Sequence, residues 1–460
     1  MDLGFETIGN ATVICYDRDP VLVTDPWITD QAYFGSWTHL CEIPDEQLCA
    51  IKSAEFVWFS HGHPDHLNPY SLPNFQRSKI LIPDHVGNRI RDDLVAQGFQ
   101  VQVLEHRKWT SLSDRIRVLC IADSNQDAIL LIDLDGTLVV NTNDAGLTGW
   151  ERWVGREIKR FRVSFLLAIS GTGDADMCNF HDNEGKRVVA LPDPSSAQLG
   201  RVIARNTDRL GARYFVPFSS MHKYQREDSY WANEYVPELE DYKRGYMSKR
   251  SEILPAFLRY DCINERVEEL APNAIPDLRI SPEVFGDNWD EPLTKGDLAR
   301  ATQYFKSIEH LSEFLDYINL RVGGVDNVIA LGRKKFERGL MFEVPRKSLM
   351  TAITGAIFDD LLIGNFMKTT LVGRWGPRGL YPDFTPYVAK YADNGYAKTS
   401  EQLRDYMAQY RKRDPLHFRL HQIEQAGIDL ITDAVHPSSP AYLLAQKIYS
   451  LIKFRQMGRQ

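Results

Sequence analysis

The chain has 460 residues, of which 43% are hydrophobic, and its formal net charge is −8 at pH 7. A chain of this length exceeds the size at which one hydrophobic core keeps growing, so two domains are expected. The acidic balance disfavours non-specific nucleic-acid binding, and no apolar run approaches the roughly 20 residues that span a bilayer. Six scattered cysteines favour a reducing cytoplasm over a disulfide framework. We therefore expect a cytoplasmic protein without a membrane or nucleic-acid partner.

Three short apolar runs open the chain. Residues 9–16 and 21–27 flank a turn at residues 17–20, which predicts a β-hairpin. Residues 54–60 are apolar and rich in aromatic and β-branched side chains, which predicts a buried strand that ends at Ser60.

The loop after this strand carries four metal-capable side chains in six positions: His61, His63, Asp65 and His66. Imidazoles two residues apart on an extended loop can converge on one cation. The turn that Pro64 favours displaces Asp65 and His66, which can then reach a second cation. Histidines of a polar loop can also merely form hydrogen bonds, but this density directly after a buried strand favours a site for two metals.

Further elements follow in alternation. Residues 86–97 and 195–210 predict helices, because each stretch ends at a glycine, Gly98 or Gly211. Residues 128–132 and 137–144 predict a second hairpin around a turn at residues 133–136, and this hairpin ends at Asp144. Residues 211–218 predict a late strand, followed by Ser219 and Ser220.

The two hairpins and the His-rich loop resemble the metallo-β-lactamase fold, an αββα sandwich with a dinuclear metal site at one edge. The resemblance implies that Asp144 bridges the two metals. Hydrolases of this fold normally supply a third histidine before the second hairpin, and this chain has none between His106 and His181. By register Asp123 falls at that position, and Asp127 is a poorer candidate. Asp123 fits a solvated turn or a cap almost equally well.

A carboxylate at position 123 would change the metal preference. Two histidines and one carboxylate form the facial arrangement of non-haem Fe(II) sites, so His61, His63 and Asp123 would hold one iron. Asp65, His66 and the bridging Asp144 would then hold the second metal, and Asp65 and Asp144 would be the catalytic carboxylates. Two iron ions are favoured over zinc or manganese, although imidazole and carboxylate sites accept all three metals.

The last ligand of the hydrolytic relatives usually follows the late strand. Here the nearest imidazole is His222. It could bind a metal, contact the substrate or be an ordinary loop histidine.

One branch of this fold is more similar than the others. Residues 141–144, 170–177 and 213–219 resemble the CMP-N-acetylneuraminate hydroxylases, which hold iron in this fold and insert oxygen into a C–H bond. Those enzymes also carry a Rieske cluster, which needs paired Cys-x-His and Cys-x-x-His ligands. The six cysteines here include no such pair of motifs. The chain is in this respect similar to di-iron monooxygenases of the fold without a Rieske domain, and an external donor of the ferredoxin or reductase type would supply electrons.

The C-terminal third predicts a second, mainly helical α+β domain, with residues 1–281 as the metal domain and residues 282–460 as an accessory domain. Thr294 predicts a helix cap before residues 295–308, and residues 311–320, 348–358 and 401–413 also predict helices. Strands are expected at residues 327–331 and 339–344. Residues 361–367 are apolar and predict core or a pocket wall. This domain would cover the metal site and provide apolar walls for a bulky or acyl-carrying substrate.

Two functions fit these patterns. The first is a non-haem di-iron monooxygenase that uses O₂ to hydroxylate a C–H bond of a small molecule. The alternative is a zinc or manganese hydrolase, in which a metal-activated hydroxide attacks an ester, thioester, lactone or phosphodiester. The ligand change at Asp123 and the missing late histidine favour the first.

Overall fold

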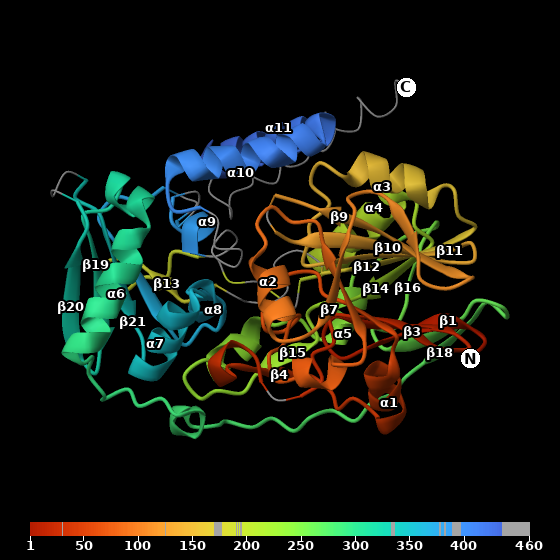
Figure 1. Ribbon diagram of the computed structural model, residues 1–460, viewed down its shortest axis with the longest axis horizontal. Helices are drawn as coiled ribbons and strands as arrows, with labels where there is room; N and C mark the ends of the chain where they lie inside the picture. The colour runs from red at the N-terminus through yellow and green to blue at the C-terminus, as the bar shows by residue number, and fades with distance from the viewer. Residues whose placement is uncertain are drawn as a thin grey trace.

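Two β-sheets packed face to face make up most of the first 270 residues (Figure 1). The computed structural model describes residues 1–434 except 30, 125, 170–176, 190, 192, 194–195, 333–335, 377–378, 381–382 and 389–396, with the backbone alone for 428–434. Residues 170–176, part of the resemblance to the hydroxylases, therefore lie outside the described residues.

The first sheet has eight strands in the order β18-β17-β1-β2-β3-β5-β6-β7. Their bounds are β1 Leu3–Ile8, β2 Thr12–Asp17, β3 Asp19–Thr24, β5 Phe56–Trp58, β6 Lys79–Pro83, β7 Gln100–Leu104, β17 Leu258–Asp261 and β18 Arg266–Glu269. The predicted opening hairpin is β2–β3, and β5 lies parallel to β3 and β6. The predicted strand before the His-rich loop is therefore central in this sheet.

The second sheet has seven strands in the order β16-β14-β12-β11-β10-β9-β8. Their bounds are β8 Trp109–Ser111, β9 Ile116–Ala122, β10 Ala128–Leu134, β11 Thr137–Asn143, β12 Val163–Ala168, β14 Tyr214–Pro217 and β16 Glu252–Ile253. Every residue of β10 and β11 is buried, as expected for strands covered on both faces. These two strands are the predicted second hairpin.

Helices cover the outer faces of both sheets (Figure 1). Their bounds are α1 Asp45–Ser53, α2 Arg89–Ala96, α3 Glu151–Ile158, α4 Gln198–Leu210 and α5 Leu239–Lys243. Between the sheets lies an apolar cluster in which the rings of Phe5 and Phe165 are 4.9 Å apart. The αββα sandwich predicted from the sequence is therefore confirmed.

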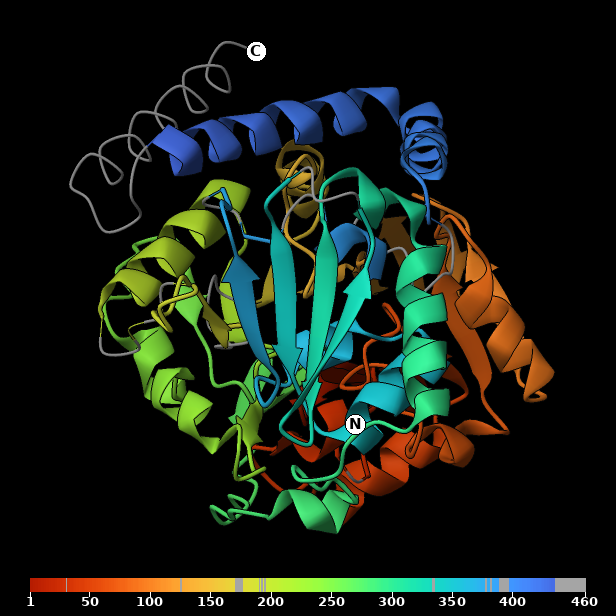
Figure 2. The ribbon, with the colours of Figure 1, turned by 90° about the vertical axis from the view of Figure 1, so that its left-hand side faces the viewer.

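A third sheet lies beside the sandwich and is seen face-on in Figure 2. Its order is β13-β22-β21-β19-β20, with β13 Phe180–His181, β19 Tyr317–Val322, β20 Val325–Ala330, β21 Gly339–Glu343 and β22 Lys368–Val372. We call residues 282–434 the C-terminal unit. The sheet has its own apolar cluster, but β13 comes from the chain before the predicted boundary at residue 281. That boundary stays a prediction.

Helices surround this sheet and extend over the sandwich. Their bounds are α6 Lys295–Ser307, α7 Arg346–Gly355, α8 Asp359–Ile363, α9 Thr385–Val388, α10 Ser400–Arg413 and α11 Pro415–Ala434. Helix α11 spans from the third sheet to the sandwich along one side, while an extended stretch joins them along the opposite side (Figure 1). None of the helices within the described residues is long and apolar enough to cross a membrane.

Most of the elements predicted for the C-terminal unit are confirmed. Thr294 caps α6 and accepts a hydrogen bond from the Asp297 amide. The predicted helix at residues 311–320 is wrong: a short 3-10 helix, Glu309–Glu313, leads into β19. Alternate residues of β19 are buried, which is the period of a strand rather than a helix. Residues 361–363 of the apolar stretch are buried in the core.

Candidate metal centre

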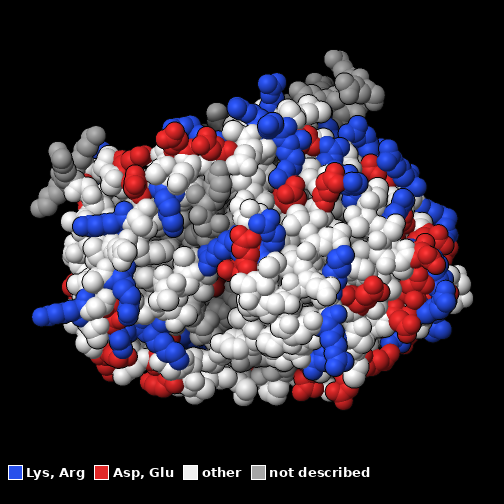
Figure 3. All heavy atoms as spheres, in the orientation of Figure 1, with Lys and Arg blue, Asp and Glu red and all other residues white. Residues whose placement is uncertain are grey.

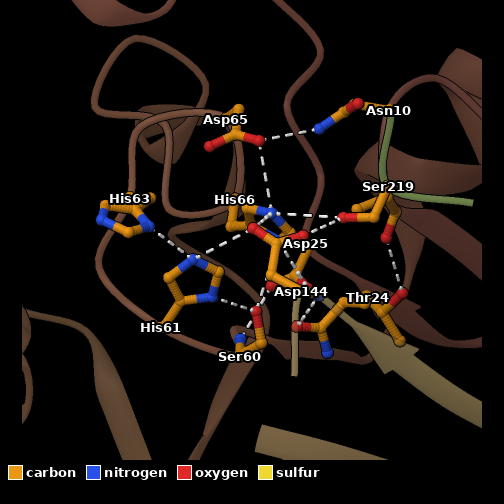
Figure 4. Close-up of polar contacts among 12 residues, drawn as sticks. Asn10, Thr24, Asp25, Ser60, His61, His63, Asp65, His66, Asp144 and Ser219 are labelled. Atoms are coloured by element: carbon orange, nitrogen blue, oxygen red, sulfur yellow. Dashed lines mark hydrogen bonds and ion pairs between the residues drawn. The ribbon is translucent and has the colours of Figure 1, made fainter. Parts of the chain in front are cut away.

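The His-rich loop leaves β5 at the edge of the first sheet. Backbone hydrogen bonds fix its start: the Phe59 amide donates to Leu81 and the Asp25 amide to Trp58. The Ser60 amide donates to the Asp25 carboxylate at 2.7 Å. The loop therefore begins from a rigid strand end, which directs its side chains into the space shown in Figure 4.

His61, His63 and Asp144 form a first group whose ligand atoms lie within 4.8 Å of one another. Nε2 of His61 is 2.9 Å from Nδ1 of His63 and 3.7 Å from Oδ2 of Asp144. The Ser60 hydroxyl lies 2.8 Å from the other nitrogen of His61, Nδ1. Because Nδ1 is occupied in this way, Nε2 is the nitrogen that faces the group.

Asp65, His66 and Asp144 form a second group of the same kind. Nε2 of His66 is 3.1 Å from Oδ2 of Asp144 and 3.3 Å from Oδ2 of Asp65. On its far side, Nδ1 of His66 is 3.1 Å from the Asp25 carboxylate. This carboxylate orients the ring, as outer carboxylates do for metal-bound histidines.

Asp144 is the residue that the two groups share. It follows β11 directly, after Asn143, whose backbone has a positive φ of 36°. The Ser219 hydroxyl donates a hydrogen bond to Oδ1 of Asp144, which leaves Oδ2 between the two imidazoles (Figure 4). The structure therefore brings together the five residues that the sequence predicted for a bridged pair of metals: His61, His63, Asp65, His66 and Asp144.

Buried polar partners fix the charge state of the second group. Burial by itself would raise the pKa of Asp65, but His66 and the Tyr33 hydroxyl hold it well below its usual value. Tyr33 donates to Oδ1 of Asp65 at 2.6 Å and Asn10 donates to Oδ2 at 2.9 Å. Burial raises the pKa of Asp25. Asp65 is therefore held as an anion, the form that binds a metal ion.

Helix α8 adds two residues that the sequence analysis missed. Asp359 and Asp360 form a third group with His63, and Oδ2 of Asp359 lies 2.9 Å from Nε2 of His63. His63 and Asp359 are separated by 296 positions. In the sequence, Asp359 and Asp360 are only an acidic pair before an apolar run. No local pattern could have placed them beside the loop.

Asp123 and Asp127 lie at the turn between β9 and β10, where the Asp123 amide donates to the Asp127 carbonyl. In the described part of the chain, neither belongs to a group of metal-capable side chains. Asp123 instead lines a small hollow beside α10 and α11, with His106, Trp150 and Tyr410 among its neighbours. Its role as a ligand stays a prediction.

His222 lies on a short strand, β15 His222–Tyr224, which pairs with β4 Trp37–His39. The pairing sets His222 opposite His39, and both are buried. His222 stacks on Trp37, with ring centroids 3.4 Å apart. None of the four ring nitrogens has a hydrogen-bond partner among the described residues. Burial lowers the pKa of His222 to about 3 and that of His39 to about 4, so both are neutral at pH 7.

A cavity of about 240 Å³ adjoins the loop, between the ends of β5 and β6 and the start of α2. Ser60 and His61 form one wall, and Phe59, Ile82 and Ile90 contribute apolar surface. The cavity is therefore close to the metal-capable groups and mixed in polarity.

The donor set fits transition metals. Three imidazoles and two carboxylates in two overlapping groups suit zinc, iron or manganese. Together with two facing sheets, outer helices and a His-rich loop at the sheet edge, these groups decide the fold. The chain has the metallo-β-lactamase fold.

Comparisons with known proteins agree with this metallo-β-lactamase fold. The chain is 28% identical over 132 residues to the cytidine monophosphate-N-acetylneuraminic acid hydroxylase of Danio rerio, which is 27% of this chain and 22% of that protein. It is 28% identical over 156 residues to the hydroxylase of Macaca mulatta, covering 31% and 26%. The chain thus spans about a quarter of the length of these relatives. The resemblance to the CMP-N-acetylneuraminate hydroxylases that was predicted from the sequence is confirmed over the matched part of the chain. No family model matches the chain.

Two solved structures are similar to part of the chain. One is Igni18, a metallo hydrolase of Ignicoccus hospitalis, with 16% identity, a TM-score of 0.37, and coverage of 58% of this chain and 99% of that one. The other is CmlA, a diiron β-hydroxylase of Streptomyces venezuelae, with 13% identity, a TM-score of 0.37, and coverage of 58% and 54%. We infer no activity from likenesses of this size.

Proposed function

We propose that this protein is a non-haem di-iron monooxygenase that hydroxylates a C–H bond of a small molecule. One iron would be held by His61 and His63, the other by Asp65 and His66, and Asp144 would bridge them. When bound, such a pair of irons supplies the activation of O₂. An external donor of the ferredoxin or reductase type would deliver the electrons.

The position of Asp144 carries the proposal. One carboxylate oxygen lies 3.7 Å from His61 Nε2 and 3.1 Å from His66 Nε2, so a single side chain serves both groups. The ring centroids of these two imidazoles are 4.3 Å apart. Two cations held by neighbouring groups would repel each other, and a shared carboxylate would offset that repulsion.

Two further observations favour hydroxylation. The curated relatives are hydroxylases by their names, and each is 28% identical to this chain over the matched part. The two groups that share Asp144 also combine histidines with the carboxylates of Asp65 and Asp144. Histidine and carboxylate donors together are the ligand types of non-haem Fe(II) sites.

The protein's own residues would hold the site in place during the reaction. Tyr33 and Asn10 fix both oxygens of Asp65, Asp25 orients His66, and Ser219 fixes one oxygen of Asp144. The cavity beside His61 offers apolar surface for a small substrate. Burial excludes bulk water from His66 and Asp65, which limits side reactions. His222 is a further ligand candidate for the second metal, since its ring nitrogens are buried and unpartnered.

Metal analysis tests the proposal. We expect protein purified without added metal to contain about two irons per chain. After chemical reduction and removal of the reductant, this protein should consume O₂ on mixing with air-saturated buffer, whereas Asp144→Ala should consume none. Zinc or manganese protein that hydrolyses 4-nitrophenyl esters or bis(4-nitrophenyl) phosphate, with loss of that activity in Asp144→Ala, would instead establish the hydrolase.

A further inference from the structure

Helix α8 of the C-terminal unit is held against the metal centre by buried contacts. The Ser36 hydroxyl donates to the Gly364 carbonyl at 2.6 Å, and the Asn365 amide donates to the Tyr224 hydroxyl at 2.9 Å. The rings of Phe34 and Phe366 pack edge to face 6.0 Å apart. Because polar and apolar contacts fix the residues directly after α8, the C-terminal end of this short helix is held in place by packing.

The first turn of α8 brings Asp359 to the side of His63 that faces away from His61. Nδ1 of His63 is 2.9 Å from Nε2 of His61, while Nε2 of His63 is 2.9 Å from Oδ2 of Asp359. An imidazole that binds a cation through one nitrogen carries its proton on the other. The two ring nitrogens of His63 therefore have different roles. Nδ1 faces the metal group, and Nε2 donates its proton to Asp359.

Asp359 is itself buried, with 1% of its surface exposed. Its second oxygen, Oδ1, has no hydrogen-bond partner among the described residues. A buried carboxylate with an unpartnered oxygen costs stability unless positive charge compensates it. His63 beside it supplies such charge only when protonated or when its ring is polarised by a bound cation. A cation bound at Nδ1 of His63 would supply compensating positive charge beside this buried side chain.

We propose that Asp359 is a positioning residue for the metal bound by His61 and His63. It accepts the Nε2–H of His63 and so fixes the tautomer in which the Nδ1 lone pair faces the divalent metal. This inference rests on the proposed two-metal function. Both parts of the protein would then contribute to the metal centre. The loop of the sandwich supplies the ligand His63, and α8 of the C-terminal unit supplies Asp359, which orients it.

Metal affinity separates this role from simple packing. Apo protein is titrated with Co(II) or Zn(II) against a chromophoric chelator, for wild type, Asp359→Ala, Asp359→Asn and the control Asp405→Asn, an exposed acid on α10. Loss of a carboxylate behind a metal-bound histidine typically weakens metal binding by about 10- to 100-fold. We expect Asp359→Ala to weaken one site by that factor and leave the other unchanged. Asp359→Asn should recover most of the loss, because its amide oxygen still accepts the Nε2–H.

The outcomes discriminate between the two levels of proposal. Wild-type affinities at both sites in Asp359→Ala would overturn the positioning role alone. A wild-type chain that binds fewer than two metals would overturn the two-metal function instead. If Asp359→Ala does not fold, the tautomer of His63 in the wild-type protein still tests the proposal. ¹⁵N-histidine spectra of the apo protein, with His63 assigned through His63→Gln, should show the Nε2–H tautomer, and the Nδ1–H tautomer would refute the role of Asp359.

Discussion

At the scale of single residues, the site depends on a few side chains that each make two contacts. Ser60 holds His61 through its hydroxyl and Asp25 through its amide. Tyr33 and Asn10 hold the two oxygens of Asp65. Since these partners are buried, each ligand has little freedom left to lose when a metal binds. Such pre-organisation favours tight metal binding.

The shared carboxylate predicts an unequal effect of two substitutions. His61→Ala removes one ligand of one metal, so this protein should retain close to one metal per chain after dialysis. Asp144→Ala removes a ligand of both metals and should retain markedly less than one. Elemental analysis of dialysed protein measures this difference, with Asp405→Asn as the charge control. Equal metal content in the two variants would show that Asp144 does not bridge.

The sequence was sufficient for the residues that lie close together along the chain. The spacing of His61, His63, Asp65 and His66 after a buried strand predicted two overlapping groups, and the family resemblance added Asp144. Asp359 and Tyr33 could not be found in this way, because their places beside His63 and Asp65 result from tertiary packing. The ligand role of Asp123 rests on register along a hairpin and stays a prediction.

At the scale of elements, predictions succeeded where local chemistry specifies a boundary. Helix α4 ends at Gly211, whose φ of 82° is in the left-handed region that glycine adopts readily. The capping box of Thr294 begins α6. The predicted helix at residues 311–320 was wrong because this apolar stretch, which has mixed periodicity, spans the 3-10 turn and the start of β19. Only pairing with β20 and β21 decides between helix and strand there.

A buried ion pair joins the sandwich to the C-terminal unit. Arg226 is fully buried and donates to Asp287 at 2.7 Å, while Asp287 also accepts from the Ser348 amide at the start of α7. The guanidinium lies 4.0 Å from the ring centre of Phe366. One side chain therefore links the late loop of the sandwich, the extended connection and the segment after α8.

Removal of one partner of this ion pair should be costly. Arg226→Ala leaves the Asp287 carboxylate buried without its cation, and such a loss typically destabilises a protein by about 3–5 kcal/mol. Urea unfolding of Arg226→Ala, Asp287→Ala and the double variant measures it. We expect the double variant to be less destabilised than the sum of the two single variants. Strict additivity would mean that the pair does not contribute to docking.

At the scale of the whole molecule, the C-terminal unit and the sandwich are joined by several segments. Strand β13 leaves the sandwich to pair with β22, and the Tyr406 hydroxyl on α10 donates to the Ser124 carbonyl. Charged side chains of both signs are interspersed over the face seen in Figure 3, without an extended field of one sign. The two parts are joined by strand pairing, buried hydrogen bonds and ion pairs such as that between Arg413 and Asp84.

Buried histidines give the apo protein a predictable response to acid. His39 and His222 are buried, and burial lowers their pKa values from 6.5 to about 4 and about 3. Between pH 6.5 and 4 the unfolded chain binds protons at these residues and the folded chain does not. The free energy of unfolding must then fall as the pH falls through this window, by up to about 2.7 kcal/mol per pH unit for the two residues together.

Two other groups do not reverse this sign. The pKa of His66 is raised, so this residue opposes the trend only near pH 6.5 and above, while the unfolded chain is still gaining its proton, and contributes little slope at lower pH. Burial raises the pKa of Asp25, which opposes the trend by at most one proton. Unfolding of chelator-treated protein, followed by circular dichroism from pH 7 to pH 4.5, should therefore show decreasing stability toward acid. Burial also lowers the pKa values of His85 and His106 to about 4, and these two residues add to the slope with the same sign. His39→Gln should therefore have a slope shallower by roughly a quarter, and a slope equal to that of wild type would mean that His39 is not buried as a neutral group.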